Sequence, residues 1–258
     1  HTKYCIQNFI LQKILKVLLQ QVRIYETNIC PSVLSMIGYT IRKGKLYLYV
    51  ENKGNQTLET LIENKIEINE TQKLIIAYGI AKTLEILHSH KIVLRNINSS
   101  NIVLDSNYHP YLSDFSLSIQ TEIRPSYLIC QKTLDLMKGE FIAPELKSKE
   151  YLILSSLDPT KIDSESIEKY IKNQNSHKID VYSFGVVLHF LFTGKVKYDK
   201  DVKLPNNIGY NWQKLINECL DEKVESRPDF IKICKNIEEI AKNKSINKDD
   251  FNNYKAQF

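Results

Sequence analysis

The sequence predicts an α+β fold in which a small, strand-containing first part precedes a larger helical part. Two observations predict it. The longer β-rich runs lie within the first 50 residues, and beyond them apolar residues recur mostly at the spacing of helices. The chain of 258 residues is also long enough to bury a large core, either as one big domain or as two closely packed lobes.

The first part of the chain contains a predicted helix and two predicted strands. Apolar residues at helical spacing over Asn8–Glu26 predict one amphipathic helix. Two β-rich runs follow, Leu34–Ile41 and Lys45–Val50, joined by a short turn through Lys43-Gly44. The polar segment Glu51–Gln56 then predicts a connector to the helical part.

The helical part begins with helices and short strands. Thr57–Glu63 predicts a short helix, and a second helix begins at Asn69–Gln72, where a side-chain acceptor precedes Gln by three residues. One face of that second helix carries the apolar residues Leu74, Tyr78, Ala81, Leu84 and Leu87. We expect short strands at Ile102–Leu104 and Tyr111–Leu112, on either side of a turn.

Three further helices are predicted in the remainder of the chain. Asp180–Thr193 is apolar nearly all round, which predicts a buried central helix, and Gly194 is placed to end it. Trp212–Leu220 and Asp229–Lys242 predict two more helices. Residues 245–258 are rich in Asn and Lys, and we expect them to form a frayed tail.

Charge and cysteine usage narrow the classes of partner and compartment. The net charge of +5 is spread along the chain, so no basic stripe predicts nucleic-acid binding. The five cysteines are far apart and form no C-x-x-C pair, which argues against a zinc site or a disulfide framework and favours a reducing, cytoplasmic compartment. No apolar run is long enough to insert into a membrane. Because the chain begins with His1, we expect a piece of a longer polypeptide.

One stretch carries the strongest functional signal. Leu94–Asn101, followed by Asp114–Ser116, resembles the catalytic loop and the metal-binding turn of eukaryotic protein kinases, whose patterns are H-R-D-x-x-x-x-N and D-F-G. The residues at that family's spacing are Arg95, Asn101, Asp114 and Phe115. The position of the catalytic base holds Asn96 instead of Asp, and the position of the following lysine holds Asn98.

Other motifs of the same family occur in order along the chain. The matches are Tyr49–Asn52 at the hinge, Leu87–His90 before the catalytic loop, Ala143-Pro144-Glu145, Asp180–Gly185, Cys219-Leu220 and Glu225–Pro228. The last two resemble the pattern of tyrosine-kinase-like and tyrosine kinases. The resemblance implies a two-lobe kinase-like fold: a truncated first lobe at 1–50, a hinge at 51–56, a helical lobe at 57–244 with an insert at about 148–177, and a tail at 245–258.

Several matched residues have structural roles in that family. The resemblance implies an ion pair between Glu145 and Arg227, which ties the end of the activation segment to the helical lobe. It also implies that Asp180 holds the backbone of the catalytic loop and that Phe115 packs in the apolar spine between the lobes. Arg95 belongs to the same scaffold. These residues would be kept in an active and in an inactive kinase alike.

The residues that carry chemistry in the family are altered. A neutral amide at Asn96 is a very poor base, and general-base help is worth roughly 10²–10⁴-fold in rate. Asn98 lacks the positive charge that the family's lysine places near the transferring phosphate. The combination predicts a pseudokinase that binds and regulates other proteins in signalling. Two alternatives stay open: a weak serine/threonine-type kinase that works by positioning ATP and Mg²⁺, and a nucleotide-sensing module.

The metal and nucleotide positions are only partly kept. Asn101 and Asp114 match the two metal-holding positions of the family, so the resemblance implies that they coordinate Mg²⁺ from bound ATP. The alternative is that Asn101 caps a turn and Asp114 hydrogen-bonds backbone amides. The resemblance also places Glu51 of the hinge and Val103 beside the nucleotide.

The first lobe is poorly equipped to hold ATP. No G-x-G-x-x-G occurs anywhere in the sequence. The glutamate position of the family's C-helix holds Gln21, which cannot form an ion pair with a lysine. Lys3 is the candidate for that lysine, and an ordinary surface lysine is the alternative. We therefore expect weak binding of ATP and Mg²⁺, or none.

Overall fold

The structure combines a small strand-containing lobe with a larger helical lobe, as the sequence predicts. This computed structural model describes residues 29–42, 45–54, 56–121, 139–147, 165–166, 176–199, 204–243 and 246–258. The predicted helix Asn8–Glu26, with the site candidate Gln21, lies outside the described residues, and so do Lys3 and the turn Lys43-Gly44. Most of the predicted insert also lies outside them.

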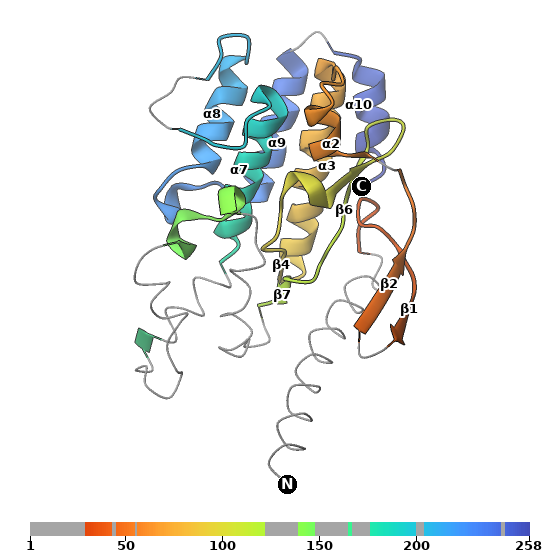
Figure 1. Cartoon of the computed structure of the whole chain (residues 1–258). Coiled ribbons are helices and arrows are strands. Elements are labelled where there is room, and N and C mark those ends of the chain that lie inside the picture. The colour runs from red at the N-terminus through yellow and green to blue at the C-terminus, as the bar shows by residue number, and fades with distance from the viewer. Residues whose placement is uncertain are drawn as a thin grey trace.

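The small lobe contains an antiparallel hairpin of β1 (Met36–Arg42) and β2 (Lys45–Val50), in which Tyr39 lies opposite Leu48. Figure 1 shows the hairpin beside the helical lobe, at the edge of the molecule. A hairpin alone buries little apolar surface in water. It depends on contacts with the rest of the chain, and half-buried side chains of the hairpin, Leu48 among them, pack against the main core.

The segment before the hairpin is joined to the helical lobe. The backbone N–H of Leu34 donates to the carbonyl of Leu112 at 3.3 Å, and the N–H of Leu112 donates to the carbonyl of Ser32 at 2.8 Å. Because Leu34 makes this contact and is buried, the strand begins at Met36, and the predicted strand Leu34–Ile41 started too early.

Short strands bring distant loops of the helical lobe together. β3 (Gln56–Thr57), β5 (Ile102–Leu104) and β6 (Pro110–Leu112) form a three-stranded antiparallel sheet with β5 in the middle. β4 (Ile92–Val93) pairs with β7 (Ile119–Gln120). The loop between β4 and β5 and the loop between β6 and β7 are therefore held at the same end of these strands.

Hydrogen-bonded caps begin the first two helices of the helical lobe, and the cap at Asn69 is the predicted one. α2 (Leu58–Glu63) is capped by Thr57, whose hydroxyl accepts from the backbone of the third helical residue. α3 (Glu70–Ser89) has a capping box, since Asn69 Oδ1 accepts from the Gln72 N–H and Gln72 Oε1 accepts from the Asn69 N–H, both at 2.9 Å. Together these bonds satisfy N–H groups that have no partner within the helix.

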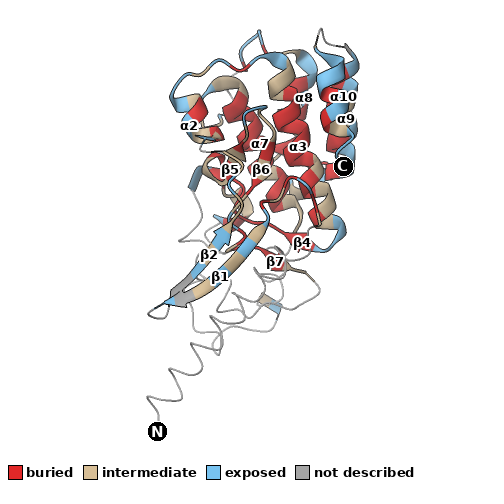
Figure 2. Cartoon of the chain, turned by 90° about the vertical axis from the view of Figure 1, so that its right-hand side faces the viewer, coloured by how far each residue is buried: buried red, intermediate tan, exposed pale blue. Residues whose placement is uncertain are grey.

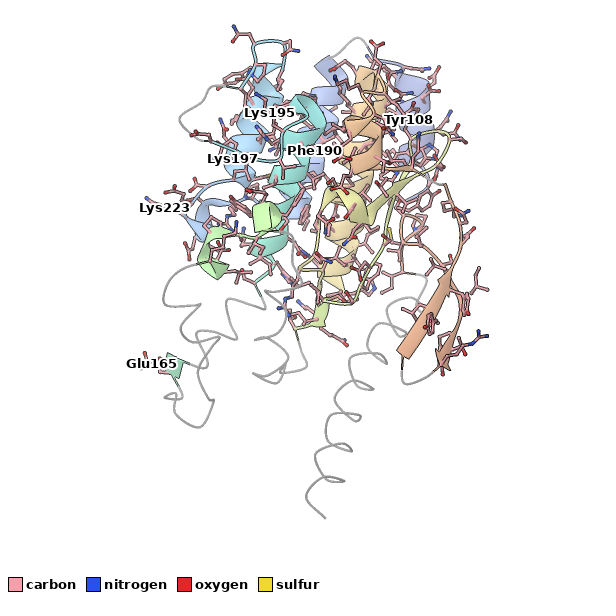
Figure 3. All side chains as sticks on the ribbon, viewed as in Figure 1. Tyr108, Glu165, Phe190, Lys195, Lys197 and Lys223 are labelled. Carbon is pink, nitrogen blue, oxygen red and sulfur yellow. The ribbon has the colours of Figure 1, made fainter. Side chains whose placement is uncertain are left out.

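α7 (Lys178–Thr193) is the buried central helix that its apolar sequence predicts, and it ends at Gly194, which has a φ of 69°. Phe190 of this helix is buried, and Figure 3 shows it among the side chains of the helical lobe. α8 (Tyr210–Cys219) and α9 (Phe230–Asn243) lie near the predicted positions. Figure 2 shows many buried residues on α3 and α7. Among the described residues, no helix is both long and apolar enough to cross a membrane.

The frayed tail predicted for residues 245–258 is wrong, because the chain forms a docked helix there. α10 (Lys248–Lys255) is capped by the side chain of Asn247. Phe251 is 4% and Tyr254 1% exposed, and the ring of Tyr254 stacks on His109 at 4.5 Å between centroids. Although the segment is polar in composition, these aromatic side chains lie one helical turn apart and anchor it to the helical lobe.

The docking of α10 depends on a glycine of α3. A Cβ atom at Gly79 would lie 2.1 Å from the hydroxyl oxygen of Tyr254 and 2.6 Å from Cγ of Pro110. The same hydroxyl lies 3.1 Å from Oγ of Ser32 in a buried hydrogen bond. The missing side chain at position 79 thus leaves the space in which Tyr254 reaches the segment before the hairpin.

Candidate functional site

The loop between β4 and β5 is held by the central helix. The carboxylate of Asp180 is fully buried and accepts hydrogen bonds from the backbone N–H groups of Leu94 at 2.8 Å and Arg95 at 2.7 Å. Arg95 has a φ of 66°, which is uncommon for a residue other than glycine. The contact predicted for Asp180 is therefore present. Because a buried carboxylate needs such donors, the loop and α7 fix each other's position.

His88 at the end of α3 is another partner of Asp180. Its Nε2 lies 2.9 Å from Oδ2 of that carboxylate, and its ring stacks on the ring of His177 at 4.3 Å. Burial, and then the neighbouring His88, lower the pKa of His177 to about 4, so His177 is neutral at neutral pH. The sequence analysis used His88 only as part of a motif. The contact could have been inferred from the sequence, because a buried Asp180 needs further hydrogen-bond donors.

Side-chain amides surround the carboxylate at the end of β6. Nδ2 of Asn96 donates to Oδ2 of Asp114 at 3.0 Å, and Nδ2 of Asn98 donates to Oδ1 of Asn96 at 3.0 Å. Oδ1 of Asn98 accepts from the backbone N–H of Ser100 at 3.1 Å and from its hydroxyl at 2.6 Å. Nδ2 of Asn101 donates to the carbonyl of Asn96 at 3.1 Å and lies 3.5 Å from Oδ2 of Asp114. The structure therefore brings these four predicted site residues together.

The amide at position 96 is a hydrogen-bond donor toward the site. Asn96 is 9% and Asn98 2% exposed, and each amide already contacts the other. An amide oxygen has negligible basicity, and here that oxygen faces Asn98. Consequently, position 96 offers no group that takes up a proton from an incoming hydroxyl.

A buried ion pair joins η4 (Pro144–Leu146) to the helical lobe. The guanidinium of Arg227 binds the Glu145 carboxylate in a bidentate manner, at 2.8 and 2.9 Å. The same guanidinium donates to the carbonyl of Lys178 at 3.1 Å and stacks over the ring of Tyr182 at 5.0 Å. The ion pair that the sequence predicts between Glu145 and Arg227 is present, and it fixes the end of the segment that follows the amide cluster.

The family match covers most of the chain. The family described as "Protein tyrosine and serine/threonine kinase" matches residues 6–237. The chain belongs to the protein kinase superfamily. In this kinase domain, the loop held by Asp180 corresponds in position to the family's catalytic loop, and Asp114 begins the turn that corresponds to D-F-G.

Similar kinases are found in an amoeba and in plants. A "probable inactive serine/threonine-protein kinase" of Dictyostelium discoideum is 27% identical over 221 residues, covering 80% of this chain and 17% of that protein. A "probable serine/threonine-protein kinase" of the same organism is 25% identical over 225 residues, covering 79% and 15%. A proline-rich receptor-like protein kinase of Arabidopsis thaliana is 29% identical over 208 residues, covering 75% and 29%. The chain thus spans less than a third of the length of these relatives.

The predicted nucleotide contacts are only partly visible in this kinase domain. The backbone N–H of Glu51 donates to the carbonyl of Ser35 at 2.8 Å, and its carboxylate pairs with Lys53 at 2.6 Å. Val103 is half-buried in β5, opposite Thr57. The contacts of Glu51 and Val103 with ATP stay predictions. The first-lobe candidates Lys3 and Gln21 lie outside the described residues.

Kinases of this superfamily generally use ATP with Mg²⁺, so the donor set at Asp114 can be compared with what Mg²⁺ requires. Among the described residues, no group of three or more His, Cys, Asp and Glu side chains could hold a metal. Oδ2 of Asp114 accepts from Asn96, and Oδ1 accepts from the backbone N–H of Ser116 at 3.2 Å. Mg²⁺ prefers a shell of carboxylate, phosphate and water oxygens. Each oxygen of this carboxylate therefore already accepts a hydrogen bond from an N–H donor, which competes with a metal ion for it.

Proposed function

We propose that this kinase domain is a pseudokinase that acts in signalling by binding other proteins and does not transfer phosphate. The observation that carries the proposal is the hydrogen bond of 3.0 Å between the Asn98 and Asn96 amides. These two neutral amides stand at the positions that hold the catalytic base and the lysine in the kinase family.

Phosphoryl transfer requires positioned phosphates, neutralised charge and an acceptor for the hydroxyl proton. Asn96 directs an N–H group at Asp114, so it does not serve as the proton acceptor. Asn98 is buried and neutral, so it supplies no positive charge to a transferring phosphate. Both changes raise the barrier to transfer, and general-base loss alone costs roughly 10²–10⁴-fold in rate.

Two predicted scaffold contacts are present among the described residues of the helical lobe, which supports a role through binding. Asp180 holds the catalytic loop, and Arg227 holds Glu145. These contacts hold the loop between β4 and β5 and η4 (Pro144–Leu146) on the helical lobe. One of the similar proteins, the Dictyostelium kinase with 27% identity, carries "inactive" in its name.

A weak kinase is the second candidate, and a specific observation favours it. Asn101 and Asp114 correspond to the metal-holding positions, and Nδ2 of Asn101 lies 3.5 Å from Oδ2 of Asp114. Most of the similar proteins are named as kinases without the word "inactive". Positioning and electrostatics carry most of phosphoryl transfer, so losing the base lowers the rate without abolishing it.

Incorporation of labelled phosphate distinguishes these candidates. The purified chain is incubated with ATP labelled at its γ-phosphate, alone and with generic protein substrates. We expect incorporation no higher than that of an Asp114→Ala variant, because both chemistry positions are neutral amides. Incorporation clearly above that control would replace the pseudokinase proposal with the weak kinase. The gain-of-function variant Asn96→Asp/Asn98→Lys should transfer phosphate only if the first lobe holds ATP.

A further inference from the structure

The oxygen and nitrogen positions of the side-chain amides in the catalytic loop can be assigned, starting from a backbone N–H group. The backbone N–H of Ser100 can only donate, so the amide atom of Asn98 that faces it at 3.1 Å must be the oxygen. The nitrogen of Asn98 therefore faces Asn96, and the atom of Asn96 that receives it at 3.0 Å must be the oxygen. This leaves the nitrogen of Asn96 directed at Oδ2 of Asp114, at 3.0 Å.

The orientation of Asn96 is thus a property of the network and not a free choice between amide rotamers. Turning the Asn96 amide over would place its oxygen against the Asp114 carboxylate and its nitrogen against the Asn98 nitrogen. Both contacts would be repulsive. The donor that faces Asp114 is also nearly buried, since Asn96 is 9% exposed, whereas Asp114 itself is exposed to solvent.

We propose that the Asn96 carboxamide takes the place of a divalent cation at Asp114, so that this site is independent of Mg²⁺. The proposal rests on the proposed function, because a site without transfer chemistry has no need to polarise a phosphate through a metal. It names Asn96 as the positioning residue that sets the cation requirement of the site.

The chemistry follows from what each group offers to a cation. A cation that approaches Oδ2 of Asp114 meets the partial positive charge of the Asn96 N–H group, which already occupies one lone pair of that oxygen at 3.0 Å. An aspartate at position 96 would instead present a second carboxylate at about the same distance. Like charges that close repel each other, and a bound cation relieves the repulsion. Because Asp114 is exposed, access does not limit the cation.

The test compares the melting temperature of the full chain in EDTA, in millimolar MgCl₂ or MnCl₂, and in NaCl of matched ionic strength. No nucleotide is present. The wild-type chain should respond to MgCl₂ no more than to NaCl. Asn96→Asp should melt a few degrees lower in EDTA and should recover as Mg²⁺ or Mn²⁺ is added, because ligands that bind the folded state stabilise it.

The matched control exchanges the two side chains. Asn96→Asp/Asp114→Asn has the same composition and charge as the wild type and restores one amide and one carboxylate at the same contact. It should melt near the wild-type temperature and lose the cation response of Asn96→Asp. A purely structural role for Asn96 would not produce this rescue.

Other outcomes would overturn the proposal. A saturable Mg²⁺ or Mn²⁺ shift in the wild type that Asp114→Asn abolishes would do so, and so would an Asn96→Asp variant that ignores cations. If Asn96→Asp does not fold, the wild type is tested alone by titration with Mn²⁺, and free Mn²⁺ is measured by electron paramagnetic resonance. Mn²⁺ binding to the wild type that is lost in Asp114→Asn refutes the inference. Absence of Mn²⁺ binding at Asp114 supports it. If the wild type responds to cations but transfers no phosphate, this inference fails and the pseudokinase proposal stands. If the wild type transfers phosphate, the pseudokinase proposal itself fails.

Discussion

Arg227 concentrates several long-range contacts in one buried side chain. It is 1% exposed, and its guanidinium donates to the Glu145 carboxylate and to the carbonyls of Lys178 and Asp221. A one-sided deletion leaves a buried charge or unsatisfied donors. Glu145→Ala and Arg227→Ala should each therefore lower the free energy of unfolding by about 3–5 kcal/mol. Denaturant titration of each variant measures the loss.

The double variant and an exposed pair serve as controls for this prediction. Glu145→Ala/Arg227→Ala should cost less than the sum of the single changes, because the partners are coupled. Glu239→Ala breaks the exposed pair with Lys242, whose side chains are 62% and 68% exposed, and should change the free energy of unfolding far less than either buried change. Small and additive losses at Glu145 and Arg227 would show that the buried pair contributes little.

At this scale the identity of the site residues was predictable, and their hydrogen bonds were not. The spacing of Arg95, Asn101 and Asp114 in the sequence is enough to place them in one site. The contact of Asn96 with Asp114 depends on which way each amide is turned. That orientation is set by the backbone of Ser100, through a network that only the folded loop creates.

The helices also divide into those that the sequence predicts and those that depend on contacts made only in the folded chain. α3 was predictable because its capping box and its apolar face are local in sequence. α10 was not, because it is held by contacts of the aromatic side chains Phe251 and Tyr254 with residues far away in the chain, such as Tyr78. Composition alone therefore gave the wrong result for residues 245–258, since a polar segment can dock through very few large side chains.

Tyr254 provides a test of how α10 is held. Tyr254→Phe removes the hydroxyl that lies 3.1 Å from Ser32 Oγ in a buried hydrogen bond, and should lower the free energy of unfolding by about 1–3 kcal/mol. Tyr210→Phe is the matched control, because Tyr210 is 77% exposed and the change should be nearly neutral. Thermal or denaturant unfolding reports both variants. Equal effects at the two positions would mean that the buried hydroxyl does not hold α10.

For the whole molecule, the order of motifs was sufficient to predict the two-lobe kinase fold, because each motif fixes a different part of the helical lobe. Of the predicted first lobe, the structure describes the hairpin, β1 (Met36–Arg42) and β2 (Lys45–Val50), which is present as predicted. The predicted nucleotide contacts come from both lobes, and the candidates Lys3 and Gln21 stay predictions while the helical-lobe residues have defined positions.

The response of the whole domain to ATP tests whether both lobes still cooperate. A ligand that binds only the folded state adds about 1.4 kcal/mol at a concentration tenfold above its dissociation constant. Because Gln21 cannot anchor a lysine and the sequence has no glycine loop, we expect millimolar ATP with Mg²⁺ to raise the melting temperature little or not at all. Melting is measured without ligand, with ATP, with ATP and Mg²⁺, and for Asp114→Ala. A large Mg²⁺-dependent rise that Asp114→Ala abolishes would favour nucleotide sensing.

Gly79 has a consequence for anyone who would engineer this domain. Helix propensity ranks glycine about 1 kcal/mol below alanine in a helix interior, so a propensity-based redesign would replace it. The Cβ of that alanine would lie 2.1 Å from the Tyr254 hydroxyl and 2.6 Å from the Pro110 ring. At this position, helix propensity therefore favours alanine, whereas packing against Tyr254 and Pro110 favours glycine. A redesign that keeps α10 must keep the glycine, and a consensus built only from helix statistics would release the C-terminal helix.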